Sequence, residues 1–289
     1  MNIIPKMDSN VNYIQTEVVI LEKICYTDFA GHELDKKNTK AGDECMRNYK
    51  LTIQYDGTRY NGWQRQGNTP NTIQEKFEMV LSRMCEKPIE IFASGRTDAG
   101  VHAERQIANF KCDTELSCEE IHAYLNRYLP EDIRVTDVTE VEERFHSRLH
   151  AVSKTYEYRI ATRKPDVFQR KYVYLTEKLP DIAVMQESAK LFLGKHDFKG
   201  FSSVGKTKKS TERTIHSIAI TETDGIISIR INGSGFLYHM VRIIAGTLLE
   251  LGSGERSMES IRQVFEERDR KKAGATLPAC GLKLMEVLY

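Results

Sequence analysis

The sequence has no long apolar run: no stretch approaches the roughly 20 apolar residues that a membrane-spanning helix needs. Its first residues lack the apolar core of a secretory signal, and residues 1–45 are too acidic for a transit peptide. The six cysteines are scattered, without a Cys-x-x-Cys pair. A disulfide framework or zinc site is therefore not expected, and a reducing cytoplasm is the expected location.

A large excess of one charge sign is also missing, because 42 basic residues nearly balance 41 acidic ones in a chain of 289. The balance is uneven along the chain. Residues 1–45 are acidic, and the remainder carries a modest positive excess that permits nucleic-acid binding without requiring it. We expect the folded part to begin near Met46, itself a candidate start residue, with residues 1–45 as an extension that is disordered or not translated.

From Met46 onward, strand-like alternation and helix-like spacing follow one another. Two capping boxes, Thr72 with Glu75 and Ser117 with Glu120, predict helix starts. The predicted strands are 51–55, 89–94, 105–111, 133–141, 155–160, 213–222, 226–232 and 282–288. The predicted helices start at the two boxes or lie over 181–193, 236–251 and 257–267.

This order predicts an α/β (α+β) fold of two ferredoxin-like, RRM-like βαββαβ halves. The halves, residues 46–150 and 151–289, are expected to join around a central mixed or antiparallel sheet with an active-site cleft.

The segment Gly95–Ala103 lies between two predicted strands and reads Gly-Arg-Thr-Asp-Ala-Gly-Val-His-Ala. Its two glycines allow a sharp turn and a close approach of backbone to a ligand. By itself the pattern is also that of an ordinary loop, in which Asp98 would bond to nearby backbone. A carboxylate two residues after Arg96 nevertheless suits chemistry on an anionic polymer.

Six ordered blocks make the chain from Met46 to Tyr289 resemble the bacterial tRNA pseudouridine synthase A family. The blocks are residues 55–66, 95–103, 145–148, 154–158, 236–242 and 273–281. The resemblance implies a homodimer that acts without metal or organic cofactor on uridines 38, 39 and 40 of the tRNA anticodon stem-loop. It also implies that Asp98 is the catalytic carboxylate, that Tyr156 stacks on the target base, that Arg242 pairs with Asp98 and that Arg96 helps to hold the nucleotide out of the stem.

The chemistry is compatible with one carboxylate. A glycoside hydrolase needs two, because one protonates the leaving group while the other attacks or activates water. The uracil anion is delocalised over two carbonyls, and the base itself returns to the sugar, so a single Asp98 is adequate. Asp98 could attack the sugar or act on the base.

Other residues permit two interpretations each. Tyr156 and Tyr158 lie two apart on a predicted strand and so share a face, either as base platforms or as core aromatics. Trp63, the only tryptophan, is expected to pack rather than to contact RNA. In the segment 203–213, Lys206, Lys208 and Lys209 are expected to bind phosphates.

Two other functions were weighed. A non-catalytic RNA-binding module with RRM-like halves is disfavoured because no RNP1-type segment is present. A nucleoside glycosidase would need a second carboxylate, for which Glu104 is the nearest candidate. The sequence therefore predicts a tRNA-modifying isomerase.

Overall fold

The structure is a computed structural model that describes residues 46–205 and 207–289. The predicted extension, residues 1–45, and Lys206 lie outside the described residues. The strands are β1 Arg47–Tyr55, β2 Ile91–Ala93, β3 His102–Cys112, β4 Ile133–Val141, β5 Ser153–Ala161, β6 Tyr174–Leu175, β7 Gly194–Asp197, β8 Glu212–Thr223, β9 Ile226–Gly233 and β10 Leu282–Leu288. The α-helices are α1 Ile73–Met84, α2 Cys118–Tyr128, α3 Ile182–Ala189, α4 Met240–Gly252 and α5 Glu259–Glu267.

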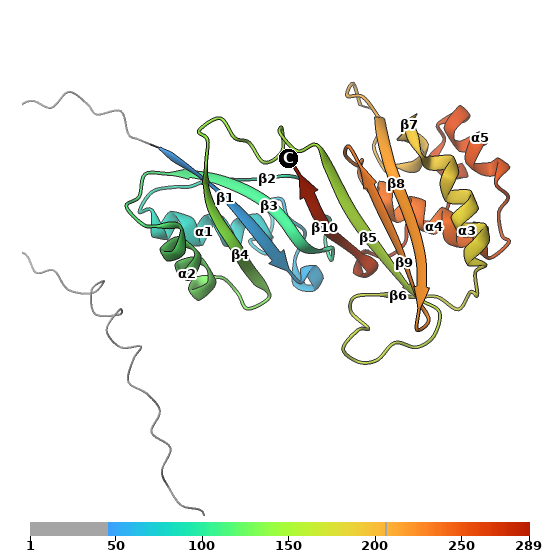
Figure 1. Cartoon of the computed structure of the whole chain (residues 1–289), viewed down its shortest axis with the longest axis horizontal. Helices are drawn as coiled ribbons and strands as arrows, with labels where there is room; N and C mark the ends of the chain where they lie inside the picture. Colours follow the sequence, from blue (N-terminus) through green and yellow to red (C-terminus); the bar gives the residue numbers. More distant parts are fainter. Residues whose placement is uncertain (1–45, 206) are drawn as a thin grey trace, which may run out of the picture. The chain divides into compact units, whose positions relative to one another are not determined.

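One ten-stranded mixed sheet runs through the described chain in the order β4-β1-β3-β10-β5-β9-β8-β7, with β2 on β3 and β6 on β5 (Figure 1). The C-terminal strand β10 joins the two halves, because it pairs parallel with β3 and antiparallel with β5. The predicted mixed sheet is thus confirmed. The description of each half as a ferredoxin-like unit, and the boundary near residue 150, stay predictions.

The hydrophobic core lies on one face of this sheet. Tyr55 pairs with Ala103, Ala103 with Leu284, and Leu284 with Tyr156, and cross-strand partners project to the same side. All four side chains are buried. Helices α1 and α2 cover the first half of the sheet, and α3, α4 and α5 flank the second (Figure 1). Among the described residues, no helix is long and apolar enough to cross a membrane.

The helix starts follow the local sequence. At Ser117 both bonds of the capping box are present, and at Thr72 the hydroxyl accepts a hydrogen bond from the Glu75 backbone N–H. The hairpin turn at Asp224 and Gly225 has positive φ at both residues, as the β8–β9 connection requires. The predicted helix over 236–251 is wrong at its start: α4 begins at Met240, after a left-handed residue at His239.

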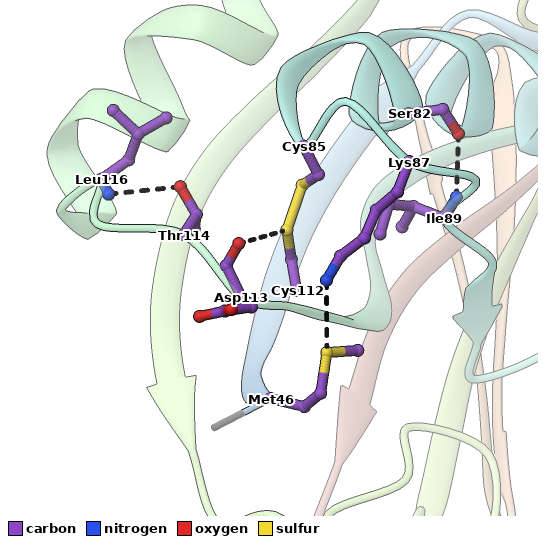
Figure 2. Close-up of a disulfide and its surroundings, with 9 residues drawn as sticks. All are labelled: Met46, Ser82, Cys85, Lys87, Ile89, Cys112, Asp113, Thr114 and Leu116. Atoms are coloured by element: carbon purple, nitrogen blue, oxygen red, sulfur yellow. Dashed lines mark hydrogen bonds between the residues drawn. A yellow bond between two sulfur atoms is a disulfide. The ribbon is translucent and has the colours of Figure 1, made fainter. Parts of the chain in front are cut away.

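One cysteine pair corrects the expectation that no disulfide forms. Cys85 at the C-terminal end of α1 and Cys112 at the end of β3 are bonded, with their Cα atoms 6.6 Å apart (Figure 2). Packing of α1 against the sheet brings them together across 27 positions, a proximity that no local spacing signals. Cys118 and Cys280 are free thiols.

Candidate active site

The loop between β2 and β3 carries Asp98, and a neighbouring segment fixes its shape. The Trp63 backbone N–H donates to the Thr97 carbonyl at 3.0 Å, and the Gly100 N–H donates to the Tyr60 carbonyl at 3.2 Å. The Tyr55 hydroxyl lies 2.8 Å from the Thr97 hydroxyl. Gly100 has a φ of +79°, which a side chain would oppose. The block over residues 55–66 therefore holds the loop, and Trp63, buried between Tyr55 and Phe77, packs as predicted.

Arg242, on the first turn of α4, pairs with Asp98 as the resemblance implies. Its Nη1 lies 3.2 Å from Asp98 Oδ2, while its Nε donates to the Leu277 carbonyl at 2.7 Å. The side chains are 14% and 23% exposed for Arg242 and Asp98, so the pair is only partly solvated. The second bond, to Leu277, holds the guanidinium in place from the opposite side. Arg242 is thus a fixed counter-charge rather than a mobile surface residue.

Tyr156, in β5, contributes the aromatic wall of the same cavity. The cavity has a volume of about 430 Å³ and is lined by Asp98, Tyr156 and Phe236, among others. The Tyr156 ring lies edge-on to Phe236, with centroids 5.2 Å apart. Burial is the main cause of the raised pKa of Tyr156, so its hydroxyl stays neutral. Tyr158 projects to the same face but is fully buried and donates to the Pro278 carbonyl, which makes it a core residue.

Three basic side chains also line this cavity: Arg96, Arg148 and Lys154. Arg96 and Arg148 are exposed, whereas Lys154 is largely buried and donates to the Ser94 carbonyl. A Cβ on Gly95 would lie 2.9 Å from the Lys154 Nζ, so the space left by this glycine is occupied by the lysine. Burial, with a smaller contribution from Arg148, lowers the pKa of Lys154 to about 8. In the sequence, Lys154 stands out only as a member of the shared block 154–158.

Two of the predicted phosphate-binding lysines, Lys208 and Lys209, lie before β8 and are not among the residues that line the cavity. Lys208 and Lys209 are exposed, and Lys206 lies outside the described residues. The segment that carries them is nevertheless tied to the site at its start. The Ser203 N–H donates to the Tyr238 carbonyl at 3.0 Å, just before α4.

His239 is a site residue that the sequence reasoning missed. It immediately precedes α4, and its Nε2 lies 3.6 Å from Asp98 Oδ2. Its Nδ1 lies 3.0 Å from the Ser203 hydroxyl. Its position three residues before Arg242, inside a shared block, is the only sequence signal that could have found it.

Glu104, the proposed second carboxylate of a glycosidase, does not join Asp98. It lines a separate cavity of about 700 Å³, where it accepts a hydrogen bond from Gln54 and pairs with Lys283 at 3.1 Å. The site therefore contains one carboxylate at its centre, unlike the paired site of a glycoside hydrolase. In the part of the chain that the structure describes, no group of three His, Cys, Asp or Glu side chains could hold a metal ion.

An ion-paired carboxylate, a buried tyrosine and basic side chains lie around one cavity, an arrangement suited to an α/β enzyme that acts on an anionic substrate. The family described as tRNA pseudouridine synthase matches residues 51–148 and 188–289. The chain belongs to the tRNA pseudouridine synthase family, and it is an isomerase.

Similar proteins agree with this family. A tRNA pseudouridine synthase A from Bacillus sp. (strain KSM-64) is 53% identical over 245 residues, which are 84% of this chain and all of the relative. A tRNA pseudouridine synthase A 2 from Clostridium perfringens (strain 13 / Type A) is 46% identical over the same shares. Among solved structures, a Cbf5-Nop10-Gar1 complex is 13% identical, with a TM-score of 0.35, over 82% of this chain and 48% of that chain.

Proposed function

We propose that the protein converts uridine to pseudouridine at positions 38, 39 and 40 of the tRNA anticodon stem-loop, with Asp98 as the catalytic carboxylate. The observation that carries this proposal is that Asp98 lines the same cavity as Tyr156 and is paired there with Arg242 of α4. The guanidinium of Arg242, held by its second bond to the Leu277 carbonyl, places a fixed positive charge beside the Asp98 carboxylate. The negative charge on Asp98 can stabilise the electron-poor C1′ carbon of the ribose when its bond to the base breaks.

The reaction is an isomerisation in which atoms and charge balance. The bond between N1 and C1′ breaks, and its electron pair remains on uracil as a delocalised anion. Asp98 either bonds to C1′ or stabilises the positive charge that develops there. The base then turns and C5 bonds to C1′; where Asp98 had bonded to C1′, that bond breaks at this point and its electron pair returns to the carboxylate. The C5 proton then leaves and N1 takes up a proton. Because water would compete with the returning base, the partial burial of Asp98 favours isomerisation over hydrolysis.

The target base must leave its stem, which costs a few kcal/mol in unstacking and unpairing. Stacking on Tyr156 would recover ~1–3 kcal/mol of this. Arg96 and Arg148 are suited to the phosphates that flank an extruded nucleotide, because both are exposed at the rim of the same cavity. Lys208 and Lys209 would bind the backbone farther from the reacting base. Lys206 is proposed for the same role from its sequence position alone.

The resemblance also supports two wider proposals. The enzyme would work as a homodimer, and it would act in the cytoplasm, where its tRNA substrate is modified. We propose no resident cofactor, because the reaction needs no oxidant, reductant or group donor.

The substrate is tested with short RNA. Anticodon stem-loops that carry 5-tritiated uridine at positions 38, 39 or 40 are incubated with the full chain, and tritium release to water is counted. Release is expected because C5 loses its hydrogen when it bonds to C1′. The matched control has cytidine at all three positions and tritiated uridine elsewhere in the loop. Release from the control alone, or no release from any RNA, would contradict the proposal.

A further inference from the structure

The backbone of His239 is strained at the point where it meets the site. Its φ is 62° and its ψ is 3°, a left-handed conformation that few residues other than glycine adopt, asparagine, aspartate and histidine more often than the rest. It occupies the N-cap of α4, where Ser, Thr, Asp or Asn would normally cap the helix, yet its side chain makes no capping bond. Strain of this kind persists where the surroundings enforce it, and it concentrates at functional sites.

Two contacts show where the His239 imidazole is held instead. Nε2 faces Asp98 Oδ2 at 3.6 Å, and Nδ1 lies 3.0 Å from the Ser203 hydroxyl. A hydroxyl that donates to Nδ1 leaves the proton of a neutral imidazole on Nε2, where it faces the carboxylate. The exposed Tyr238 ring stacks on the imidazole with centroids 3.7 Å apart. The side chain is therefore held by a hydrogen bond at Nδ1 and by the Tyr238 ring on one face, with Nε2 next to the carboxylate.

The arrangement also divides the two oxygens of Asp98. Arg242 forms an ion pair with Oδ2, and the His239 imidazole lies 3.6 Å from the same oxygen. Oδ1 is accordingly the oxygen that remains for a bound nucleotide. Because Arg242 and His239 approach the carboxylate at Oδ2, Oδ1 points in a fixed direction. A fixed orientation of the reacting group increases the rate.

We propose that His239 is a positioning residue that fixes the Asp98 carboxylate and ties it, through Ser203, to the basic segment that carries Lys208 and Lys209. This inference rests on the proposed function, because it requires Asp98 to be the reacting carboxylate. Ser203 lies at the start of the basic segment and makes two hydrogen bonds to the residues just before α4. Its hydroxyl bonds to His239, and its N–H donates to the Tyr238 carbonyl. Docking of the lysines on RNA phosphates therefore sets the position of Ser203 and, through His239, the orientation of Asp98.

The charge of His239 follows from the groups that face it. Burial lowers its pKa, Arg242 and Arg270 lower it further, and Asp98 opposes them. The imidazole is thus neutral at pH 7. When the pH falls far enough to protonate it, a cation faces Oδ2 and competes with the developing charge at C1′. The wild-type rate should therefore fall on the acid side as His239 gains its proton.

The test uses single-turnover tritium release by the full chain, with RNA affinity measured on the same preparations. Ser203→Ala removes only the hydroxyl, so its rate should fall about ten-fold while its Kd for RNA stays within about two-fold. Ser203→Thr keeps a hydroxyl and should recover most of the rate. His239→Asn suits a left-handed backbone. It should lower the rate and remove the acid-side fall. The matched control is His216→Asn, an exposed histidine of β8, which should behave as wild type.

Three results would overturn the proposal. The first is a wild-type rate and acid profile in both Ser203→Ala and His239→Asn. The second is an unchanged rate with a weakened Kd, which would make His239 an RNA contact. The third is a rate loss in Ser203→Ala that Ser203→Thr does not recover. Asp98→Asn is run alongside: full activity there would refute the proposed function itself, whereas an inactive Asp98→Asn beside a normal His239→Asn would refute this inference alone.

Discussion

The Asp98–Arg242 pair couples stability and catalysis in one contact. Arg242 reaches from α4 to two acceptors that come from different parts of the chain, the Asp98 carboxylate and the Leu277 carbonyl. Removing one partner of a partly buried ion pair lowers stability by more than the pair itself contributes. The remaining charge stays partly shielded from water and no longer has an opposite charge beside it. Arg242 should therefore affect folding as well as rate.

Arg242→Ala is expected to lower the free energy of unfolding by about 2–3 kcal/mol, because it strands Asp98 and the Leu277 carbonyl. Urea unfolding of the purified variant measures this. Arg96→Ala is the matched control, since Arg96 is exposed in the Asp98 loop and should leave stability unchanged. Equal stabilities of the Arg242 and Arg96 variants would show that the pair is not a structural contact.

Lys154 carries a stability penalty that depends on pH. Its pKa is about 8 in the folded chain and 10.5 ordinarily, so the unfolded chain binds more protons between these values. Stability should therefore rise as the pH increases above 8. Relative to Lys154→Met, which cannot titrate, the wild type should gain about 2 kcal/mol between about pH 7.5 and 9.5. Parallel pH profiles of the two proteins in urea unfolding would contradict this.

At the scale of elements, the Cys85–Cys112 bond links the end of α1 to the end of β3. A disulfide stabilises mainly by restricting the unfolded chain, and the effect grows with the length of the closed loop. This bond spans 27 positions along the chain. It also fastens the helix that packs beneath the strand leading out of the Asp98 loop.

Cys85→Ser should lower the free energy of unfolding by about 3 kcal/mol, as expected for a loop of this length. Thermal or urea unfolding with and without a reductant measures the loss. Reduction should lower the free energy of unfolding of the wild type to that of the variant and should leave the variant's value unchanged. Cys118→Ser, which alters a free thiol, is the control. A wild type insensitive to reductant would contradict the prediction.

Elements with a local signal were predictable, and elements that depend on distant partners were not. The terminal strand 282–288 and the helix opened by Ser117 follow from alternation and capping, which neighbouring residues determine. The two-residue strand β6 has too few residues for a period and forms only because β5 is available to pair.

The site divides in the same way. Asp98, Arg242 and Tyr156 were assigned through shared blocks, and the structure places Asp98 and Tyr156 in one cavity, with Arg242 paired to Asp98. His239 was missed because its contacts to Asp98 and Ser203 join residues 141 and 36 positions apart, and its left-handed backbone leaves no periodic trace. The same long-range packing joins Cys85 to Cys112.

At the scale of the whole molecule, the long connection between β5 and β6 (Figure 1) carries two adjacent exposed apolar residues, Val167 and Phe168. Val167 and Phe168 are 63% and 85% exposed, and adjacent exposed apolar residues of this size are typical of contact surfaces. A second copy of the chain is the partner that the proposed homodimer requires.

Phe168→Asp should therefore shift the protein from dimer to monomer in sedimentation velocity at micromolar concentration, because it places a charge in the proposed contact. Leu179→Asp alters an equally exposed apolar residue on a different segment and serves as the control. A monomeric wild type would refute the dimer, and a Phe168→Asp variant that sediments as a dimeric wild type does would refute the proposed contact.

The central claim is that the Asp98 carboxylate performs the isomerisation in a site otherwise built to bind RNA. Its most direct test is Asp98→Asn, which keeps the size of the side chain but removes its charge. Tritium release from 5-tritiated uridine in an anticodon stem-loop should be abolished, while the affinity for that RNA stays near the wild-type value. Tritium release at the wild-type rate by Asp98→Asn would contradict the account.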